Sequence, residues 1–381
     1  MPRSFEVDVN PEIIKWARER AGYYEEEAAK KVKTSIENYK KIETGEKKPT
    51  FRQIEAFSRI FKRPLAVFLL PEPPDEPPVS ASFRVMPKSE RELPKELKWA
   101  IRKARNYQSI AHELMKDLNF NVKADVPSTT IDDDPFLLAK KQREKLGVSI
   151  EEQFSFKNAY EAFNRWRDAV EAQNILVFQF KFPVESARGF SLMDKEPSVI
   201  VLNFTDNILA RTFTLFHEYA HILLKMPEIY VEGDTINQYP EVENWCNKFA
   251  SEFLLPESVL KKENAYREFI NKTRSLEDTL KILSERFKVS RHSILTKFKI
   301  LNIISKEKYE EGKAKLEEEF RIKEHFFLPP YKRCIQEKGK KFVSIVMDSK
   351  ERGLITSADA IEYLSLKLNN LKKLTELLLR R

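Results

Sequence analysis

The residues best suited to chemistry are two histidines and a glutamate that share one short segment. His217, Glu218 and His221 form a His-Glu-x-x-His pattern in a chain with only 5 histidines, so a chance match is rare. Side chains four residues apart lie on one face of a helix, and the two imidazoles can therefore bind the same ion. Glu218 would project beside that ion, where it can take a proton from a bound water. The pattern is typical of helices that hold zinc for peptide-bond hydrolysis.

A catalytic zinc site needs a third protein ligand from elsewhere in the chain. The downstream candidates are Glu232, Asp234, Glu241, Glu243 and His292. Residues 241–255 carry apolar side chains at helical spacing, and Glu243 and Asn247 lie one turn apart on the flank of that stripe. This arrangement suits a carboxylate ligand and a neighbour that orients a ligand. We therefore expect Glu243 to bind the metal, with Glu241 as the second choice, and Cys246 to pack in the core.

A helix and a small sheet are expected to position these residues. Apolar residues at three- and four-residue steps from Leu209 to Leu223 predict a half-buried amphipathic helix around the histidines. Three β-rich segments precede it, at residues 175–180, 186–192 and 197–203, and predict the sheet. Helical periodicity covers residues 80–125, 136–172, 276–301 and 303–320. The predicted fold class is therefore mainly α with a small β-sheet (α+β).

The N-terminal region carries a different pattern. Apolar residues at helical spacing within residues 8–70 outline four or five short helices. The tight connection within residues 25–43 suits a helix-turn-helix whose second helix runs from about Ser35 to Glu43. The residues that we expect to contact DNA are Ser35, Glu37, Asn38, Lys40 and Lys41.

This region resembles the small repressor-type helix-turn-helix domain of phage and bacterial regulators. The resemblance runs from Ile14 through Glu43-Thr44-Gly45 and Lys48-Pro49-Thr50 to Phe68. It implies docking of the second helix in the major groove of DNA. One feature departs from many DNA-binding members, because three acidic residues, Glu25 to Glu27, begin the first helix of the motif and would repel phosphate. A helical partner-binding or dimerisation domain is the alternative.

A second resemblance covers residues 172–256, which are similar to the ImmA/IrrE-type family of zinc-dependent regulatory peptidases. The matching segments are Gly189-Phe190-Ser191, Val201-Leu202-Asn203, Arg211 to His221, Glu243 to Ala250 and Leu254-Leu255-Pro256. Trp245 and Cys246 differ from the residues that the family often has at these positions, but neither is an expected metal ligand.

This resemblance implies a gluzincin-like, zincin-type centre with one Zn2+ per chain. The implied ligands are His217, His221 and Glu243. Glu218 is then the general base, and Asn247 orients a ligand. Tyr230 and Tyr239 are candidates for stabilising the oxyanion, and spacing favours neither. The expected substrate is a partner protein, a repressor or an antitoxin, which would add along Pro197–Asn203 as an edge strand.

Changes in composition and a proline-rich stretch divide the 381 residues into four expected segments. The first two are a helix-turn-helix domain at residues 1–70 and a proline-rich linker at residues 71–79. A zincin-like metallopeptidase domain with a helical lead-in follows at residues 80–320, and a basic helical extension at residues 321–381. The helix pair at residues 276–301 is expected to pack as a hairpin within the peptidase domain.

Bulk composition limits the functional classes. The net charge of +8 is compatible with nucleic-acid binding, so DNA is the expected partner of the N-terminal domain, and a homodimer would suit paired half-sites. No apolar run is long enough to span a membrane, no secretory signal is evident, and two cysteines make no disulfide framework. We therefore expect a cytoplasmic protein without a membrane partner. The alternative function is a DNA-binding regulator or toxin–antitoxin component whose metal site is structural or sensory.

Overall fold

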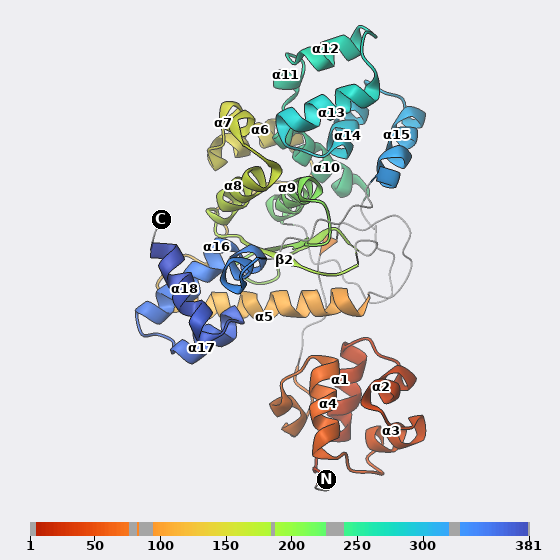
Figure 1. Cartoon of the computed structure of the whole chain (residues 1–381), viewed down its shortest axis with the longest axis vertical. Coiled ribbons are helices and arrows are strands. Elements are labelled where there is room, and N and C mark those ends of the chain that lie inside the picture. Colours follow the sequence, from red (N-terminus) through yellow and green to blue (C-terminus); the bar gives the residue numbers. More distant parts are fainter. Residues whose placement is uncertain are drawn as a thin grey trace. The chain divides into compact units, whose positions relative to one another are not determined.

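The structure, a computed structural model, describes residues 5–75, 82–83, 94–183, 187–225, 240–319 and 328–379. The chain divides into two compact units (Figure 1). Unit 1 comprises residues 1–79 and 91–103, and unit 2 comprises residues 80–90 and 104–381. The chain therefore enters unit 2, returns to unit 1, and enters unit 2 again along helix α5 (Lys95–Asp117). The four segments expected from the sequence stay a prediction.

Unit 1 is a set of short helices, as the sequence predicts. Its elements are α1 (Pro11–Arg20), α2 (Glu25–Val32), α3 (Ile36–Glu43), α4 (Phe51–Phe61), the 3-10 helix η1 (Leu65–Leu69) and the first residues of α5. The second helix of the predicted motif begins where expected, because the Ser35 hydroxyl accepts a hydrogen bond from the Asn38 amide and caps α3. Tyr39 is fully buried in the core, and a buried ion pair of 2.8 Å joins Arg18 to Glu43.

Unit 2 is built around one four-stranded sheet with the order β1-β3-β4-β2. The strands are β1 (Ser82–Phe83), β2 (Leu176–Phe180), β3 (Gly189–Leu192) and β4 (Val199–Asn203). β2 is parallel to β4, whereas β3 runs antiparallel to both β4 and β1. The three longer strands lie in the three β-rich segments, so that prediction is confirmed. β1 lies in a stretch whose pattern predicts a helix, and the sequence alone therefore misses it.

Helices enclose the sheet and the central helix α9 (Ile208–Leu224), which confirms the predicted fold class. The other helices of unit 2 are α6 (Pro135–Leu146), α7 (Ile150–Ser155), α8 (Ala159–Glu171), α10 (Pro240–Leu254), α11 (Glu257–Leu260), α12 (Asn264–Ile270), α13 (Leu276–Phe287), α14 (Arg291–Ile300), α15 (Lys306–Glu319), α16 (Pro330–Glu351), α17 (Ser357–Leu364) and α18 (Leu368–Leu379).

The surroundings of α9 correct one prediction. α9 packs on β3 and β4 and is also contacted by α8, α10 and α14. All its residues from Ala210 to Leu224 are buried, so the prediction of a half-buried helix is wrong. Some of its polar side chains form hydrogen bonds inside the protein, as when the Arg211 guanidinium donates to the Gln179 side chain of β2. The sequence pattern therefore underestimates how rigidly α9 is held.

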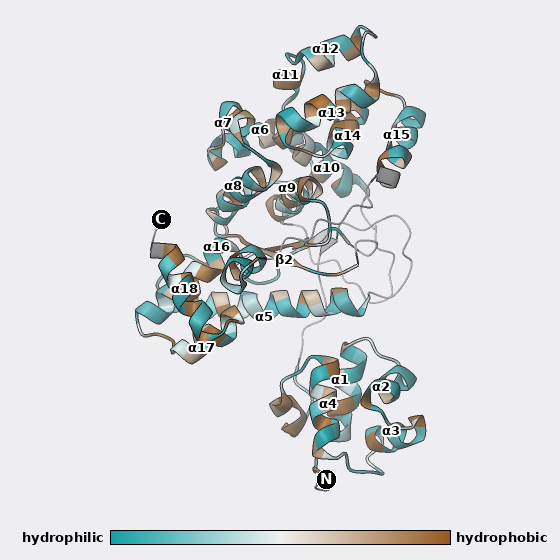
Figure 2. Ribbon diagram, in the orientation of Figure 1, coloured by the Kyte–Doolittle hydropathy of each residue, from teal (hydrophilic) through white to brown (hydrophobic). Residues whose placement is uncertain are grey.

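The helix pair of α13 and α14 packs as a hairpin, as predicted. α14 buries Ile294, Leu295 and Phe298 and contacts α9, α10 and α15, so it does not present a free recognition face. Teal and brown alternate along α5 in Figure 2, as expected for a helix that buries one side. None of the helices in the part of the chain that the structure describes has the length and hydrophobicity of a membrane span.

The helices of the predicted C-terminal extension are packed into unit 2. α16 lies against β2 and is held by a buried polar network. Arg167 of α8 pairs with Glu171 at 3.3 Å and donates to the Gln336 carbonyl at 2.7 Å, while the Lys341 amide donates to Glu171 at 3.0 Å. Gly339 interrupts α16 with a φ of 80°. These contacts make α16 part of the support of the sheet.

Candidate metal centre

α9 brings the two histidines of the pattern together. His217 and His221 are both buried, and their Nε2 atoms lie 3.2 Å apart. The spacing follows from the helix, because residues four apart lie on the same face. Since α9 is packed on several sides, it gives both imidazoles a rigid support.

α10 supplies a third group to the same point. The Glu243 carboxylate places Oε2 at 3.2 Å from the His217 Nε2 atom and Oε1 at 3.2 Å from the His221 Nε2 atom. In a tetrahedral site with metal–ligand distances of about 2.0–2.1 Å, the ligand atoms lie about 3.3 Å from one another. The observed spacing therefore fits an ion of the size of zinc, and the chemistry of the three donors suits it.

Two neighbours orient these groups. The Asn247 Oδ1 atom lies 3.2 Å from the His217 Nδ1 atom. An acceptor there keeps the proton on Nδ1 and leaves the Nε2 lone pair for a metal. Cys246 is buried, as predicted, and its thiol also lies beside the imidazole of His221. The sequence did not indicate this second contact, because it depends on how α10 crosses α9.

The electrostatics of the cluster favour a bound cation. Burial alone would raise the pKa of Glu243, but the imidazoles of His217 and His221 hold it well below its usual range. Burial alone would lower the pKa of His221, but Cys246, Glu243 and Glu218 raise it well above 6.5. The carboxylate is therefore ionised, and the metal-free His221 holds a proton that an incoming cation must displace.

Glu218 is fully buried and packs against strand β3. A Cβ atom at Gly189 would lie 3.4 Å from the Glu218 Cγ atom, 2.6 Å from the Thr214 Cγ2 atom and 2.9 Å from the Val201 carbonyl oxygen. No side chain fits in this space, so the backbone of β3 lies directly against α9. The sequence resemblance includes Gly189 only as part of a motif. The close approach of β3 to α9 explains why a glycine is needed at this position.

The structure corrects the expected position of the substrate. β4 (Val199–Asn203) pairs with β2 on one side and with β3 on the other. A peptide adds to a sheet at an edge, where backbone groups are unpaired. The prediction that a substrate lies along Pro197–Asn203 is therefore wrong. The hydrophobicity of a segment locates a strand but does not give its neighbours in the sheet.

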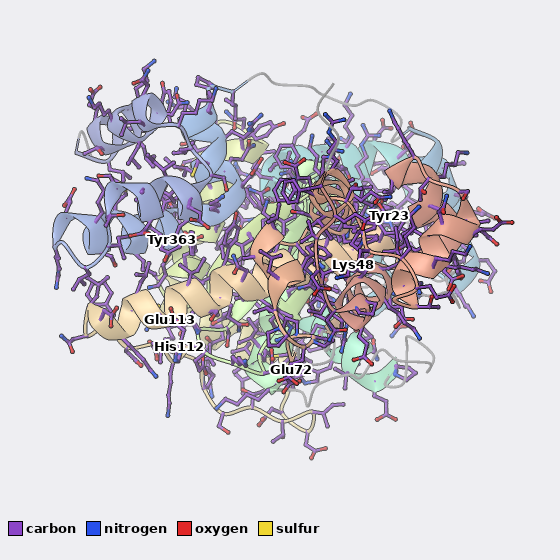
Figure 3. All side chains as sticks on the ribbon, turned by 90° about the horizontal axis from the view of Figure 1, so that it is seen from below. Tyr23, Lys48, Glu72, His112, Glu113 and Tyr363 are labelled. Atoms are coloured by element: carbon purple, nitrogen blue, oxygen red, sulfur yellow. The ribbon has the colours of Figure 1, made fainter. Side chains whose placement is uncertain are left out.

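Among the described residues, the other ligand candidates are Glu241 and His292, and neither belongs to the cluster. Glu241 is exposed on α10, and the His292 ring lies beside Tyr309 with centroids 6.2 Å apart. His112, labelled in Figure 3, has its Nδ1 atom 2.7 Å from the Glu196 carbonyl oxygen, which is a structural contact. The candidates that lie outside the described residues are Tyr230, Glu232, Asp234 and Tyr239.

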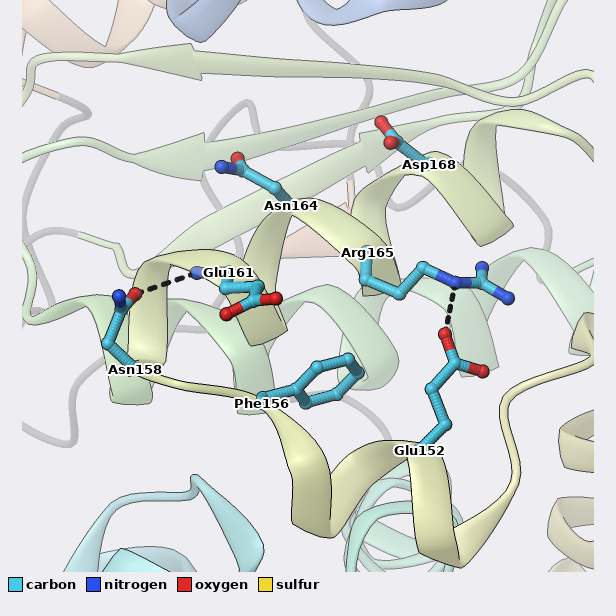
Figure 4. Close-up of a pocket in the computed structure, with 7 residues that line it drawn as sticks. All are labelled: Glu152, Phe156, Asn158, Glu161, Asn164, Arg165 and Asp168. Atoms are coloured by element: carbon cyan, nitrogen blue, oxygen red, sulfur yellow. Dashed lines mark hydrogen bonds and ion pairs between the residues drawn. The ribbon is translucent and has the colours of Figure 1, made fainter.

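A hollow on unit 2 lies between α7 and α8 (Figure 4). Its lining residues are Glu152, Phe156, Asn158, Glu161, Asn164, Arg165 and Asp168. An ion pair of 2.7 Å between Arg165 and Glu152 crosses one side of it. The hollow shares no residue with the metal centre.

The residues expected to contact DNA lie at the start of α3 and along it. They are Ser35, Glu37, Asn38, Lys40 and Lys41. The Lys40 ammonium lies 3.4 Å from a carboxylate oxygen of Glu25 at the start of α2, and Lys47 donates to the Asn38 side chain at 3.3 Å. The acidic start of α2 therefore offsets part of the positive charge of α3, and Lys41 is exposed beside it.

Comparison with known families finds two matches. Residues 170–299 match a metallopeptidase-type family described as an IrrE N-terminal-like domain, and residues 14–68 match a helix-turn-helix family. The first match includes α9 and α10 and therefore every residue of the metal centre, and the second includes α2 to α4. A comparison with curated proteins gives no significant match. Both resemblances are confirmed: an IrrE-like domain follows a helix-turn-helix domain.

Proposed function

We propose that this chain, which joins an IrrE-like domain to a helix-turn-helix domain, is a zinc-dependent endopeptidase that regulates transcription by cutting a partner repressor. The observation that carries the proposal is the convergence of His217, His221 and Glu243 at zinc-ligand spacing. The adjacent Glu218 distinguishes this centre from a purely structural one, since a structural zinc site needs no general base. A helix-turn-helix domain suits a dedicated regulator better than a general protease.

In the proposed reaction, separate residues bind the metal, transfer the proton and orient a ligand. One zinc ion, held by His217, His221 and Glu243, would polarise the scissile carbonyl and acidify the attacking water. Glu218 takes the proton from that water and returns it to the leaving amine. Asn247 keeps the His217 ring oriented toward the ion, since its Oδ1 atom lies at hydrogen-bond distance from Nδ1.

The test maps new protein N-termini in host cells that make either the wild-type chain or Glu218→Gln. We expect one new terminus, within a repressor or an antitoxin, only in cells with the wild-type chain. Glu241→Gln is the matched control, because Glu241 is an exposed acid on α10 outside the cluster, and it should cut like the wild type. Undiminished cutting by Glu218→Gln would contradict its role as base, and the absence of any Glu218-dependent terminus would contradict the peptidase proposal.

A DNA-binding regulator with a sensory metal site is the second candidate function, and the helix-turn-helix match favours it. It predicts zinc-dependent DNA binding and no Glu218-dependent cleavage. Both candidate functions require DNA or a DNA-bound repressor as a partner, so both place the protein in the cytoplasm.

A further inference from the structure

The strand that lies next to Glu218 is β3, and a further strand can add to β3 only along the edge that faces away from β4. β2, at the opposite end of the sheet, packs against α16, and its Val177 carbonyl accepts a hydrogen bond from Arg167. β3 instead lies against α9 at Gly189, where a Cβ would be 3.4 Å from the Glu218 Cγ atom. Among the described strands, β3 is therefore the one with which an extended peptide must pair to reach Glu218.

Part of this edge is already paired with the chain itself. β1 runs antiparallel to β3, with Ser82 opposite Ser191 and Phe83 opposite Phe190. β1 therefore ends opposite the residue that directly follows Gly189, the residue packed against Glu218. Figure 1 shows β1 as a short orange arrow beside the green strands, although it is far from them in the sequence. Adjacent strands lie about 4.8 Å apart, so a peptide on the outer side of β1 would be one strand farther from Glu218.

We propose that β1 is an intramolecular competitor of the substrate, which holds the substrate-binding edge of β3 until a substrate strand displaces it. This inference rests on the proposed peptidase function, because only a peptide substrate needs that edge. β1 pairs with two residues of β3, whereas a substrate strand can pair with all of Gly189–Leu192. Because β1 is tethered, its effective concentration at the edge is high, and weakly pairing peptides are excluded. The pairing therefore acts as a threshold for substrate selection.

The place of β1 in the chain connects this edge to the helix-turn-helix unit. Residues 80–90 belong to unit 2, whereas the segments on either side, residues 1–79 and 91–103, belong to unit 1. Both ends of the segment that carries β1 therefore continue into unit 1.

The experiment uses the full-length chain with Glu218→Gln, so that no peptide is cut. The variant Ser82→Pro with Phe83→Pro removes the backbone N–H groups that strand pairing needs, whereas the control Ser82→Ala with Phe83→Ala keeps them. One readout is amide hydrogen exchange across Gly189–Leu192. The other is fluorescence anisotropy of a labelled synthetic peptide with the sequence of residues 79–86.

We expect the proline variant to bind the peptide about 10-fold more tightly than the parent, because the competing tethered strand is lost. Its β3 amides should exchange faster, and added peptide should restore their protection. The alanine control should behave like the parent. Equal affinity of the parent and the proline variant, or no saturable binding to the proline variant, would overturn the inference. Neither readout needs metal or hydrolysis, so a failure of the peptidase proposal would appear separately, in the mapping of N-termini.

Discussion

Replacing Gly189 by alanine should disturb Glu218, the proposed general base, without touching a proposed metal ligand. The added Cβ would lie 2.6 Å from the Thr214 Cγ2 atom and 2.9 Å from the Val201 carbonyl oxygen. Carbon atoms in contact lie about 3.5–4.0 Å apart, so α9 and β3 must separate by about 1 Å. Overpacking of this kind lowers the free energy of unfolding by about 1–3 kcal/mol. A displacement of about 1 Å at a reacting group costs about 100-fold in rate, and we expect that loss in hydrolysis while zinc is retained.

A double-mutant cycle with Thr214→Ser separates this steric effect from a general loss of stability. Serine lacks the Cγ2 atom but keeps the hydroxyl that donates to the Ala210 carbonyl at 3.1 Å. In urea denaturation, Gly189→Ala should lower the free energy of unfolding by less in the serine background than in the wild type, with a difference of at least about 0.5 kcal/mol. Contact with the Val201 carbonyl should leave part of the cost. If Gly189→Ala unfolds at the wild-type urea concentration, or if the two changes add without coupling, the steric reasoning is refuted.

Three other perturbations test separate parts of the structure. Gly339→Ala should lower the free energy of unfolding by about 3 kcal/mol, because φ is +80° there and a Cβ would overlap a buried carboxylate of α8; an unchanged urea midpoint would contradict this. Lys41→Ala should weaken binding to a mixed-sequence DNA duplex and reduce by about 1 the slope of log affinity against log salt concentration. Glu25→Gln should strengthen DNA binding, because it releases Lys40 from its ion pair. Anisotropy titrations that show neither change would favour a protein partner for unit 1. Zinc affinity should increase with pH, because the pKa of His221 is raised and the ion must displace a proton from its imidazole. Chelator competition at about pH 6 and about pH 8 measures the affinity. Equal zinc affinity at both pH values would contradict this.

The metal cluster could be predicted because its geometry is largely local. The i, i+4 spacing puts His217 and His221 on one helix face whatever the rest of the fold does. The sequence favours Glu243 over Glu241 because Glu243 lies on the flank of the apolar stripe of the next helix, one turn from Asn247. The contact of Cys246 with His221 depends on how α10 crosses α9, and spacing along one helix does not contain that information.

The sheet shows where local patterns stop being informative. Its strands are recognisable from β-rich runs, but the order β1-β3-β4-β2 arises from pairing between distant segments. The prediction of an edge position for β4 is wrong because the pairing of β4 with both β2 and β3 leaves no local signal, although its continuous hydrophobic run is typical of an interior strand. β1 has only two residues and leaves no periodic signal. The sequence underestimates the burial of α9 because some of its polar residues, such as Arg211 and Thr214, form hydrogen bonds inside the protein.

The metal content of the purified protein tests the central claim most directly. Plasma mass spectrometry of the wild type should find about one zinc per chain, because three protein ligands converge at zinc spacing. Glu243→Ala should lose this zinc, while Glu241→Ala, which removes an exposed acid from the same helix, should keep it. Full zinc retention by Glu243→Ala, or no zinc in wild-type protein purified without chelators, would contradict the proposed centre and the peptidase built on it.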